Sequence, residues 1–232
     1  LHHIIGCGLE ELHASNTENH AAELAIHFSE SGTIAGLEKS IRYFTAAGDC
    51  AATIYAYEEA VLNYGRALTE KETQPMDSET ASILHRLSRS HFLAGAGEKA
   101  LPYLTRAFCY YETAKEITRA VDVVELPYMP ALGAQPSVTG EAVNQLRKRA
   151  LELVPAGSHR AGRLMCQIAQ IHDFQNGYDS ARAMLQQALD IGRGKRDPAL
   201  QARALANFAQ MDISNLRLAE VTQKATEAID LA

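Results

Sequence analysis

The sequence has no tryptophan, and aromatic residues make up only 6% of its 232 residues. Its four cysteines, Cys7, Cys50, Cys109 and Cys166, stand alone, so no CxxC pair is available for a zinc knuckle or a thioredoxin-like redox site. We expect these thiols to be structural residues in a reducing cytoplasm. No apolar run approaches the roughly 20 residues that a membrane-spanning helix needs, and no secretory signal peptide is recognisable.

Motifs of the common catalytic classes are also missing. There is no G-x-S-x-G elbow, no HExxH pair and no phosphate-binding loop, since the run 192–196 lacks the upstream glycine and the Ser or Thr that follows the lysine. The nine histidines show no metal-site spacing, and paired acids such as Glu58-Glu59 fit a solvated helix surface. We therefore expect no catalytic residue, no metal site and no cofactor in this sequence.

The charge of the chain is acidic rather than basic, with a formal net charge of −6. Lysines and arginines are scattered along the sequence and form no stripe that could follow a phosphate backbone. We therefore expect neither direct nucleic-acid binding nor a membrane partner.

What the chain does contain is one alanine-based signature at a nearly constant interval. The signature, Ala followed by a large apolar residue, occurs at Ala67-Leu68, Ala107-Phe108, Ala150-Leu151, Ala188-Leu189 and Ala228-Ile229. Successive copies lie 40, 43, 38 and 40 residues apart. A period of this length is typical of helix pairs stacked into a solenoid.

Apolar residues at helical spacing run through almost the whole chain, so we expect an all-α fold. A helical lead-in is predicted over residues 1–33, in which Asn16-Thr17 caps a helix ending near Ser31-Gly32. Repeats with a period of about 40 should then fill residues 34–232, beginning with helices over about 34–47 and 51–69. Glycine, proline and polar clusters predict breaks at 71–78, 95–97, 155–158, 176–177 and 192–198.

The clearest repeat lies between Leu84 and Ala107, with Leu87-Ser88, His91, Gly95, Ala100 and Leu104 between them. This pattern resembles the tetratricopeptide repeat (TPR), and the segment from Met165 to Ala188 follows the same frame. The resemblance implies a single right-handed superhelical solenoid of TPR-like hairpins over residues 1–232. Both Ser40-Phe44-Ala47 and Ala60-Tyr64-Ala67 resemble the second helix of a repeat, so we expect the helix between them to be short or merged.

A second resemblance concerns residues 20–70. The runs 22–28, 40–51 and 56–68 are similar to the helical region that follows the ATPase module in large bacterial signalling ATPases, including LuxR-type ATP-binding transcriptional regulators and ATPase-coupled nucleotide cyclases. The resemblance implies a sensing or regulatory arm that contacts a protein, a peptide, a small effector or other domains of its own chain. A free-standing adaptor that docks peptides and an oligomerisation region of a cyclase remain as alternatives.

The most irregular stretch is the proline-rich loop 127–140, which contains Pro127, Pro130 and Pro136. Loops of this length within repeat arrays are often functional, although an insertion at a repeat junction is tolerated at little cost. If the loop is functional, Tyr128 and Met129 are its candidate contacts.

The repeat frame also predicts which residues face a partner. First helices line the concave side of such a solenoid. Counted from the frame, the candidate groove residues are His85, Arg89, Phe92, Arg163, Gln170, Asp173 and Arg203. The three arginines would give the groove a basic character that attracts an acidic peptide or an anionic small molecule.

Overall fold

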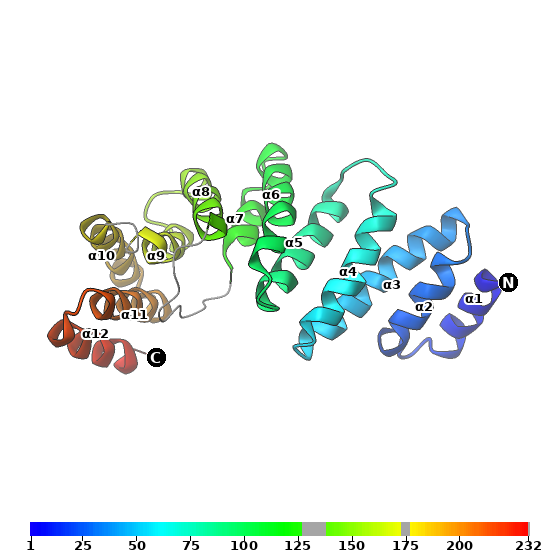
Figure 1. The fold of residues 1–232 in the computed structure, drawn as a ribbon, viewed down its shortest axis with the longest axis horizontal. Coiled ribbons are helices and arrows are strands. Elements are labelled where there is room, and N and C mark those ends of the chain that lie inside the picture. Colours follow the sequence, from blue (N-terminus) through cyan, green and yellow to red (C-terminus); the bar gives the residue numbers. More distant parts are fainter. Residues whose placement is uncertain (127–137, 173–176, 232) are drawn as a thin grey trace. The chain divides into compact units, whose positions relative to one another are not determined.

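The computed structural model of the chain describes residues 1–126, 138–172 and 177–231 (Figure 1). Within these ranges the regular structure is entirely helical, with no strand. The chain divides into two compact units, Leu1–Ala114 and Lys115–Ala232. The predicted all-α fold of TPR-like helix hairpins is confirmed, while the continuity of one solenoid through both units stays a prediction.

In the first unit, each helix packs against the helix that follows it in the chain (Figure 1). The elements are α1 (His2–Leu12), the 3-10 helix η1 (Thr17–His20), α2 (Ala21–Ser29), α3 (Ile34–Thr53), α4 (Tyr57–Lys71), α5 (Ser78–Leu93) and α6 (Gly97–Thr113).

The second unit repeats this scheme, and its helices α9 and α11 also pack directly against each other. Its elements are α7 (Ile117–Val124), α8 (Val138–Leu153), α9 (His159–His172), α10 (Tyr178–Lys195), α11 (Pro198–Ser214) and α12 (Leu218–Asp230). The successive pairs α7–α8, α9–α10 and α11–α12 are the hairpins of this unit, so α7, α9 and α11 are its first helices.

The assignment of Ser40-Phe44-Ala47 to a second helix was wrong. These residues lie in α3, which is followed directly by α4, with no helix between them. The two helices approach closely because Gly48 is buried against Tyr64: a Cβ added at Gly48 would lie 2.5 Å from the Tyr64 ring. The two segments are therefore the first and second helices of one hairpin.

Several predicted boundaries also differ. Helix α3 reaches Thr53 rather than Ala47, because Ala51-Ala52 are good helix formers and the chain turns only at Tyr55, whose φ is +63°. The expected capped helix after Asn16 is instead divided into η1 and α2. Helix α10 continues through Gly192, which permits a close approach of Gln201. It ends at Lys195, and the next residue, Arg196, has a φ of +54°.

The turn predicted at Gly95 is confirmed. Gly95 adopts a φ of +76° in the turn between α5 and α6, a conformation that glycine reaches without steric cost. Asp77 caps α5 by accepting a hydrogen bond from the Thr80 N–H, and Asp197 caps α11 by accepting one from Leu200. Helix α8 begins at Val138, so the last three residues of the predicted loop 127–140 are helical, while 127–137 lie outside the described residues.

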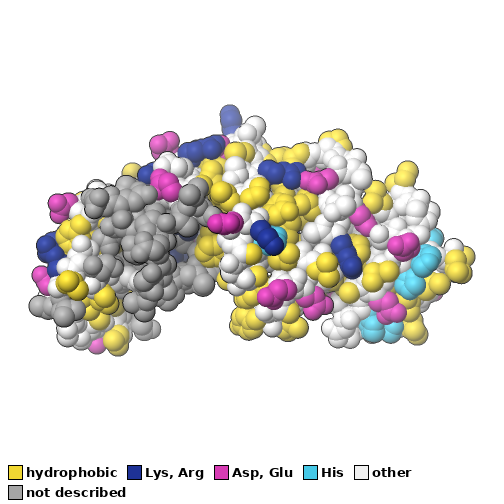
Figure 2. Space-filling model, in the orientation of Figure 1, with side chains coloured by type: hydrophobic (Ala, Val, Ile, Leu, Met, Phe, Trp, Pro, Cys, Tyr) yellow, Lys and Arg dark blue, Asp and Glu magenta, His cyan; other side chains and the backbone are white. Residues whose placement is uncertain are grey.

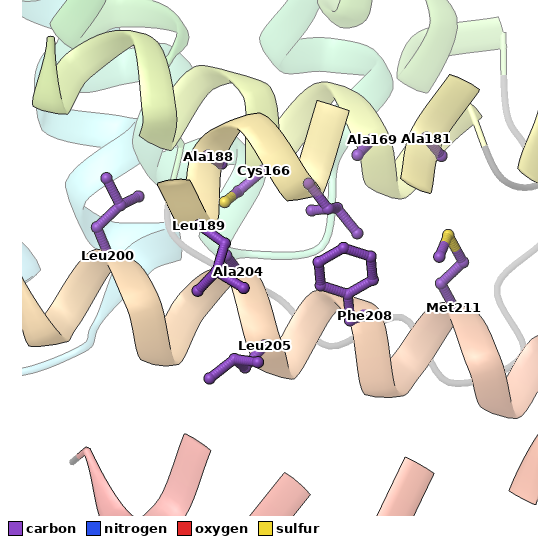
Figure 3. Packing of buried hydrophobic residues seen from close by; sticks show 11 residues of the cluster. Cys166, Ala169, Ala181, Ala188, Leu189, Leu200, Ala204, Leu205, Phe208 and Met211 are labelled. Atoms are coloured by element: carbon purple, nitrogen blue, oxygen red, sulfur yellow. The ribbon is translucent and has the colours of Figure 1, made fainter. Parts of the chain in front are cut away.

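The core of the second unit shows why alanine carries the repeat signal (Figure 3). Ala169 of α9 and Ala181 and Ala188 of α10 are nearly or fully buried, and these small side chains let the two helices come together. Phe208 and Leu200 of α11 fill the next layer and are 3% and 2% exposed. Burial of large apolar side chains at this depth contributes about 2 kcal/mol each to folding.

Candidate functional site

The first helices of the second unit carry two arginines that share one carboxylate. Glu125 follows directly after α7, and its Oε1 lies 2.9 Å from Nε of Arg163 on α9. This contact is an ion pair without hydrogen-bond geometry. The same Oε1 lies 3.9 Å from Nη1 of Arg203 on α11. The carboxylate is largely shielded from water, while both arginines are partly exposed. One carboxylate neutralises only one of the two arginine charges, so the cluster keeps a net positive charge.

Two amide side chains connect these first helices one after another. Gln167 of α9 donates from Nε2 to the Leu126 carbonyl at 2.7 Å, and Asn207 of α11 donates from Nδ2 to the Cys166 carbonyl at 3.1 Å. Gln170, half-buried on α9, donates to Oδ1 of Asn207 at 3.2 Å. This amide ladder links α7, α9 and α11, and Gln170 lies two turns along α9 from Arg163, on the same side of the helix.

Behind the amide ladder lies a buried polar group on α8. Arg147 donates from Nε to the Val124 carbonyl at 3.2 Å, and Asn144 donates from Nδ2 to the Ile168 carbonyl at 3.4 Å. Burial lowers the pKa of the Arg147 guanidinium to about 10. Oδ1 of Asn144 and Oε1 of Gln167 are buried and have no hydrogen-bond partner among the residues that the structure describes.

In the first unit, the predicted groove residues lie on α5. His85, Arg89 and Phe92 have the four- and three-residue spacing that puts side chains on one helix face. Arg89 is exposed, and the other two are half-buried. Arg86, one turn before Arg89 and Ser90, lies with its Nε 2.9 Å from Oδ1 of Asp49.

Asp49 also accepts a hydrogen bond from the Tyr64 hydroxyl at 2.7 Å. Burial and this contact with Asp49 raise the pKa of Tyr64 above its usual value. The phenol therefore stays protonated and serves as a structural donor between α3 and α4.

The structure brings together some of the predicted groove residues. Arg163, Gln170 and Arg203 converge on one face of the second unit, whereas His85, Arg89 and Phe92 belong to the first unit. Asp173, Tyr128 and Met129 lie outside the described residues. The role of all these residues as partner contacts stays a prediction.

Sequence reasoning missed Glu125, Arg147, Gln167 and Asn207. A signal for two of them was present, because Gln167-Ile168-Ala169 and Asn207-Phe208-Ala209 are 40 residues apart and occupy one repeat position. Glu125 and Arg147 had no such signal, since both lie beside the proline-rich interruption of the repeat.

The described residues form neither a metal-binding cluster nor an activated cysteine. In the described ranges, no three His, Cys, Asp or Glu side chains form a group that could hold a metal ion. Burial raises the pKa of the Cys50 thiol, and it raises that of Cys166 to about 12, which is the opposite of what a thiolate nucleophile needs. None of the described helices is long and apolar enough to cross a membrane.

The surface is likewise mixed in charge. On the face shown in Figure 2, Lys and Arg side chains are interspersed with Asp and Glu rather than gathered into a single patch. Histidines cluster at the N-terminal end, where His2 contacts His27 and the rings of His13 and His20 stack.

Comparison with known proteins gives a match only in structure. No protein-family model matches the sequence, and no curated protein does. Among solved structures, the chain is similar to BtubC (BKLC) from P. vanneervenii, with 15% identity and a TM-score of 0.62 over 94% of this chain and 87% of that one. It is also similar to a putative kinesin light chain of Podosopora anserina with nearly identical TPR-like repeats, with 10% identity and a TM-score of 0.59 over 82% and 94% of the two chains. At these identities the likeness shows that the chain has the TPR-like repeat fold.

Proposed function

We propose that the chain is a non-catalytic docking scaffold, and that the first-helix face of its second unit binds an acidic segment of a partner protein. The observation that carries this proposal is the position of Arg163 and Arg203 on adjacent first helices, both within ion-pair distance of Glu125. Their net positive charge suits an acidic partner within a protein that is itself acidic.

The neighbouring amides support the same proposal. Gln170 is half-buried, and among the described residues it bonds only through Nε2 to Asn207, so its carbonyl oxygen is available to a backbone N–H of a bound chain. The two arginines would then form ion pairs with the acidic side chains of the peptide, while Gln170 would hydrogen-bond the peptide backbone.

Fluorescence anisotropy with a labelled 12-residue peptide of alternating Glu and Leu tests this proposal. The wild-type chain should bind it more tightly than a Gln-Leu peptide of equal length. The double variant R163Q/R203Q should lose at least tenfold in affinity, because both cations of the face are removed. Arg182→Gln is the matched control, since it removes an exposed arginine of α10 away from this face. Equal binding by the double variant would refute the proposal.

For the biological setting, we propose a regulatory arm in a bacterial signalling ATPase or transcriptional regulator. The support is the sequence resemblance over residues 20–70. A cytoplasmic location belongs to this proposal and is supported by four unpaired cysteines. The alternatives are a peptide-docking adaptor and the oligomerisation region of a cyclase. Nucleotide hydrolysis by the full-length protein that changes when the acidic peptide binds would support the regulatory arm, and a full-length protein without an ATPase module would refute it.

A further inference from the structure

Two pairs of histidines join α1 to the elements that follow it in the first unit. Nδ1 of His2 lies 3.1 Å from Nδ1 of His27 on α2. The ring of His13, directly after α1, stacks on the ring of His20 at the end of η1, with the ring centroids 3.6 Å apart and an interplanar angle of 17°. All four side chains are half-buried. The pairs therefore lie at opposite ends of α1.

Apolar burial holds α1 only weakly. Gly6 is the one buried residue of this helix, and a Cβ added there would lie 3.0 Å from the Phe28 ring of α2. His3 meets the same ring edge-on, and Phe28 is fully buried. By contrast, Ile4 and Leu12 of α1 are each 73% exposed. Because the helix removes little apolar surface from water, its position depends largely on polar contacts.

One of these polar contacts does not respond to mild acid. Glu10 of α1 accepts hydrogen bonds from Lys39, Arg42 and Tyr43 of α3. Burial alone would raise the pKa of Glu10, but the hydrogen bonds from Lys39 and Tyr43 and the charges of Lys39 and Arg42 outweigh it and lower the pKa. Glu10 is therefore ionised throughout the pH range in which histidine titrates, and it keeps α1 attached to α3 there.

The histidine pairs do respond to mild acid. An ordinary histidine becomes charged near about pH 6.5. A hydrogen bond between two Nδ1 atoms needs one nitrogen without a hydrogen, so His2 and His27 cannot both be protonated and keep it. Two protonated rings stacked at the separation of His13 and His20 would place like charges in contact. Each pair therefore accommodates one proton, and the second disrupts it.

The neighbouring acids compensate little of this charge. In the described part of the chain, Glu23 of α2 is the acid within ion-pair distance of any of the four, 3.8 Å from Nδ1 of His20, and it is 56% exposed. Other charged or titratable groups on the surrounding elements contact one another: Glu10 with Lys39 and Arg42, Cys7 with His3, and Asp49 with Tyr64 and Arg86. Three acids are exposed and make no ion pair among the described residues: Glu11, Glu18 and Glu30.

We propose that α1 is a pH-sensitive cover of the first unit, closed over Phe28 at neutral pH and released in mild acid when each histidine pair takes up a second proton. Release separates α1 from α2 at both pairs and exposes the Phe28 ring, while Glu10 tethers the helix to α3. The inference concerns the first unit alone and does not depend on the proposed docking face of the second.

Hydrogen–deuterium exchange at about pH 7.5 and about pH 5.5, corrected for the intrinsic pH dependence of exchange, tests the proposal. Protection of α1 should fall by about tenfold or more at the lower pH, while that of α5 and α6 is unchanged. Equal protection of α1 at both pH values would overturn the proposal. An equal loss in α1, α5 and α6 would also overturn it, because it would report acid destabilisation of the whole unit.

Variants test whether the paired histidines are responsible. H2Q/H13Q and H20Q/H27Q each remove one member of both pairs, so neither can form adjacent cations, and α1 should have the same protection at both pH values. His159→Gln is the control, because it removes an exposed histidine of the second unit that contacts Asp197, and it should keep the wild-type response. A loss of protection in acid that persists in both double variants would overturn the proposal.

A titration of the wild-type histidines by nuclear magnetic resonance needs no variant that must fold. Each pair should take up its two protons in separate steps, the second together with the loss of α1 protection. A single common step for all four histidines would overturn the proposal.

Discussion

Gln167 and Asn207 make the same bond one repeat apart. Each donates its side-chain amide to a backbone carbonyl 41 residues earlier, Gln167 to Leu126 and Asn207 to Cys166. A repeated side-chain bond of this kind fixes the register of successive first helices more sharply than apolar contacts, which are not directional. The arginines on those helices are positioned by this register.

Replacing Asn207 should therefore weaken the second unit. Asn207→Leu has similar volume but loses the bonds to Cys166 and Gln170, and we expect a loss of about 1–3 kcal/mol of unfolding free energy. Gln145→Leu is the control, because Gln145 is exposed and, in the described ranges, bonds only Glu141 one turn away. Urea denaturation followed by circular dichroism measures both. Equal stability of the two variants would show that the amide ladder contributes nothing.

Two helical glycines should respond in opposite directions to the same substitution. Gly48→Ala puts a methyl group 2.5 Å from the Tyr64 ring, so the ring or the backbone must move. We expect this overpacking to cost about 1–3 kcal/mol of unfolding free energy, more than the gain in helix propensity of about 1 kcal/mol. Gly65→Ala meets nothing within 4 Å and should stabilise the chain by up to about 1 kcal/mol. Thermal melts of the two variants should move to opposite sides of the wild type. A higher Tm for Gly48→Ala would contradict the close approach of α3 and α4.

The last hairpin depends on a buried ion pair. Asp212 is fully buried in α11 and accepts from the Lys224 ammonium of α12 and from the Tyr178 hydroxyl at 3.0 Å. Lys224→Met would leave a buried carboxylate without its cation, and we expect a loss of about 3–5 kcal/mol. Lys195→Met, at an exposed position of α10, should change stability by less than about 0.5 kcal/mol. A small effect of Lys224→Met in guanidinium denaturation would show that the Asp212–Lys224 pair contributes little to the stability of this hairpin.

Asp77 should make the first unit sensitive to acid. Burial alone would raise the pKa of this carboxyl, but hydrogen bonds from Thr80 and Lys71 outweigh it and lower the pKa to about 2. The unfolded pKa is about 3.9, so the stabilisation is fully present above that pH and is lost as the pH falls towards 2. Because Asp77 is half-exposed, we expect only about 1 kcal/mol.

Asp77→Asn isolates this effect, since asparagine still caps the helix but does not titrate. Its unfolding free energy should converge with that of the wild type between pH 5 and pH 2. A constant difference across this range would show that Asp77 is not responsible for the acid dependence.

The fold could be predicted from the sequence because the residues that define the repeat are those that pack between helices. Ala188 and its equivalents must be small wherever helices approach, so their spacing is visible without a structure. The hairpin of α3 and α4 was misassigned because Gly48 looks like a helix-ending residue in the sequence. In the structure it lies inside α3 and lets Tyr64 of α4 pack closely against the helix. Gly192 misled the prediction for the same reason.

The candidate site was predicted only in part. Arg163 and Arg203 share a repeat position and could be placed on first helices from the sequence. Glu125, which holds them, lies at the end of an eight-residue helix where the repeat is interrupted, so no periodicity marks it. Arg147 resembles an ordinary charged helix residue in the sequence, and only the structure shows that it is buried and bonds the Val124 carbonyl at the end of α7.

The central claim is that a partner docks on the first helices of the second unit. Hydrogen–deuterium exchange of the chain with and without a saturating acidic peptide tests it directly. We predict added protection in α9 and α11, around Arg163, Gln170 and Arg203, with α10 and α12 unchanged. Protection confined to α10 and α12, or none in this unit while the peptide is bound, would contradict the account.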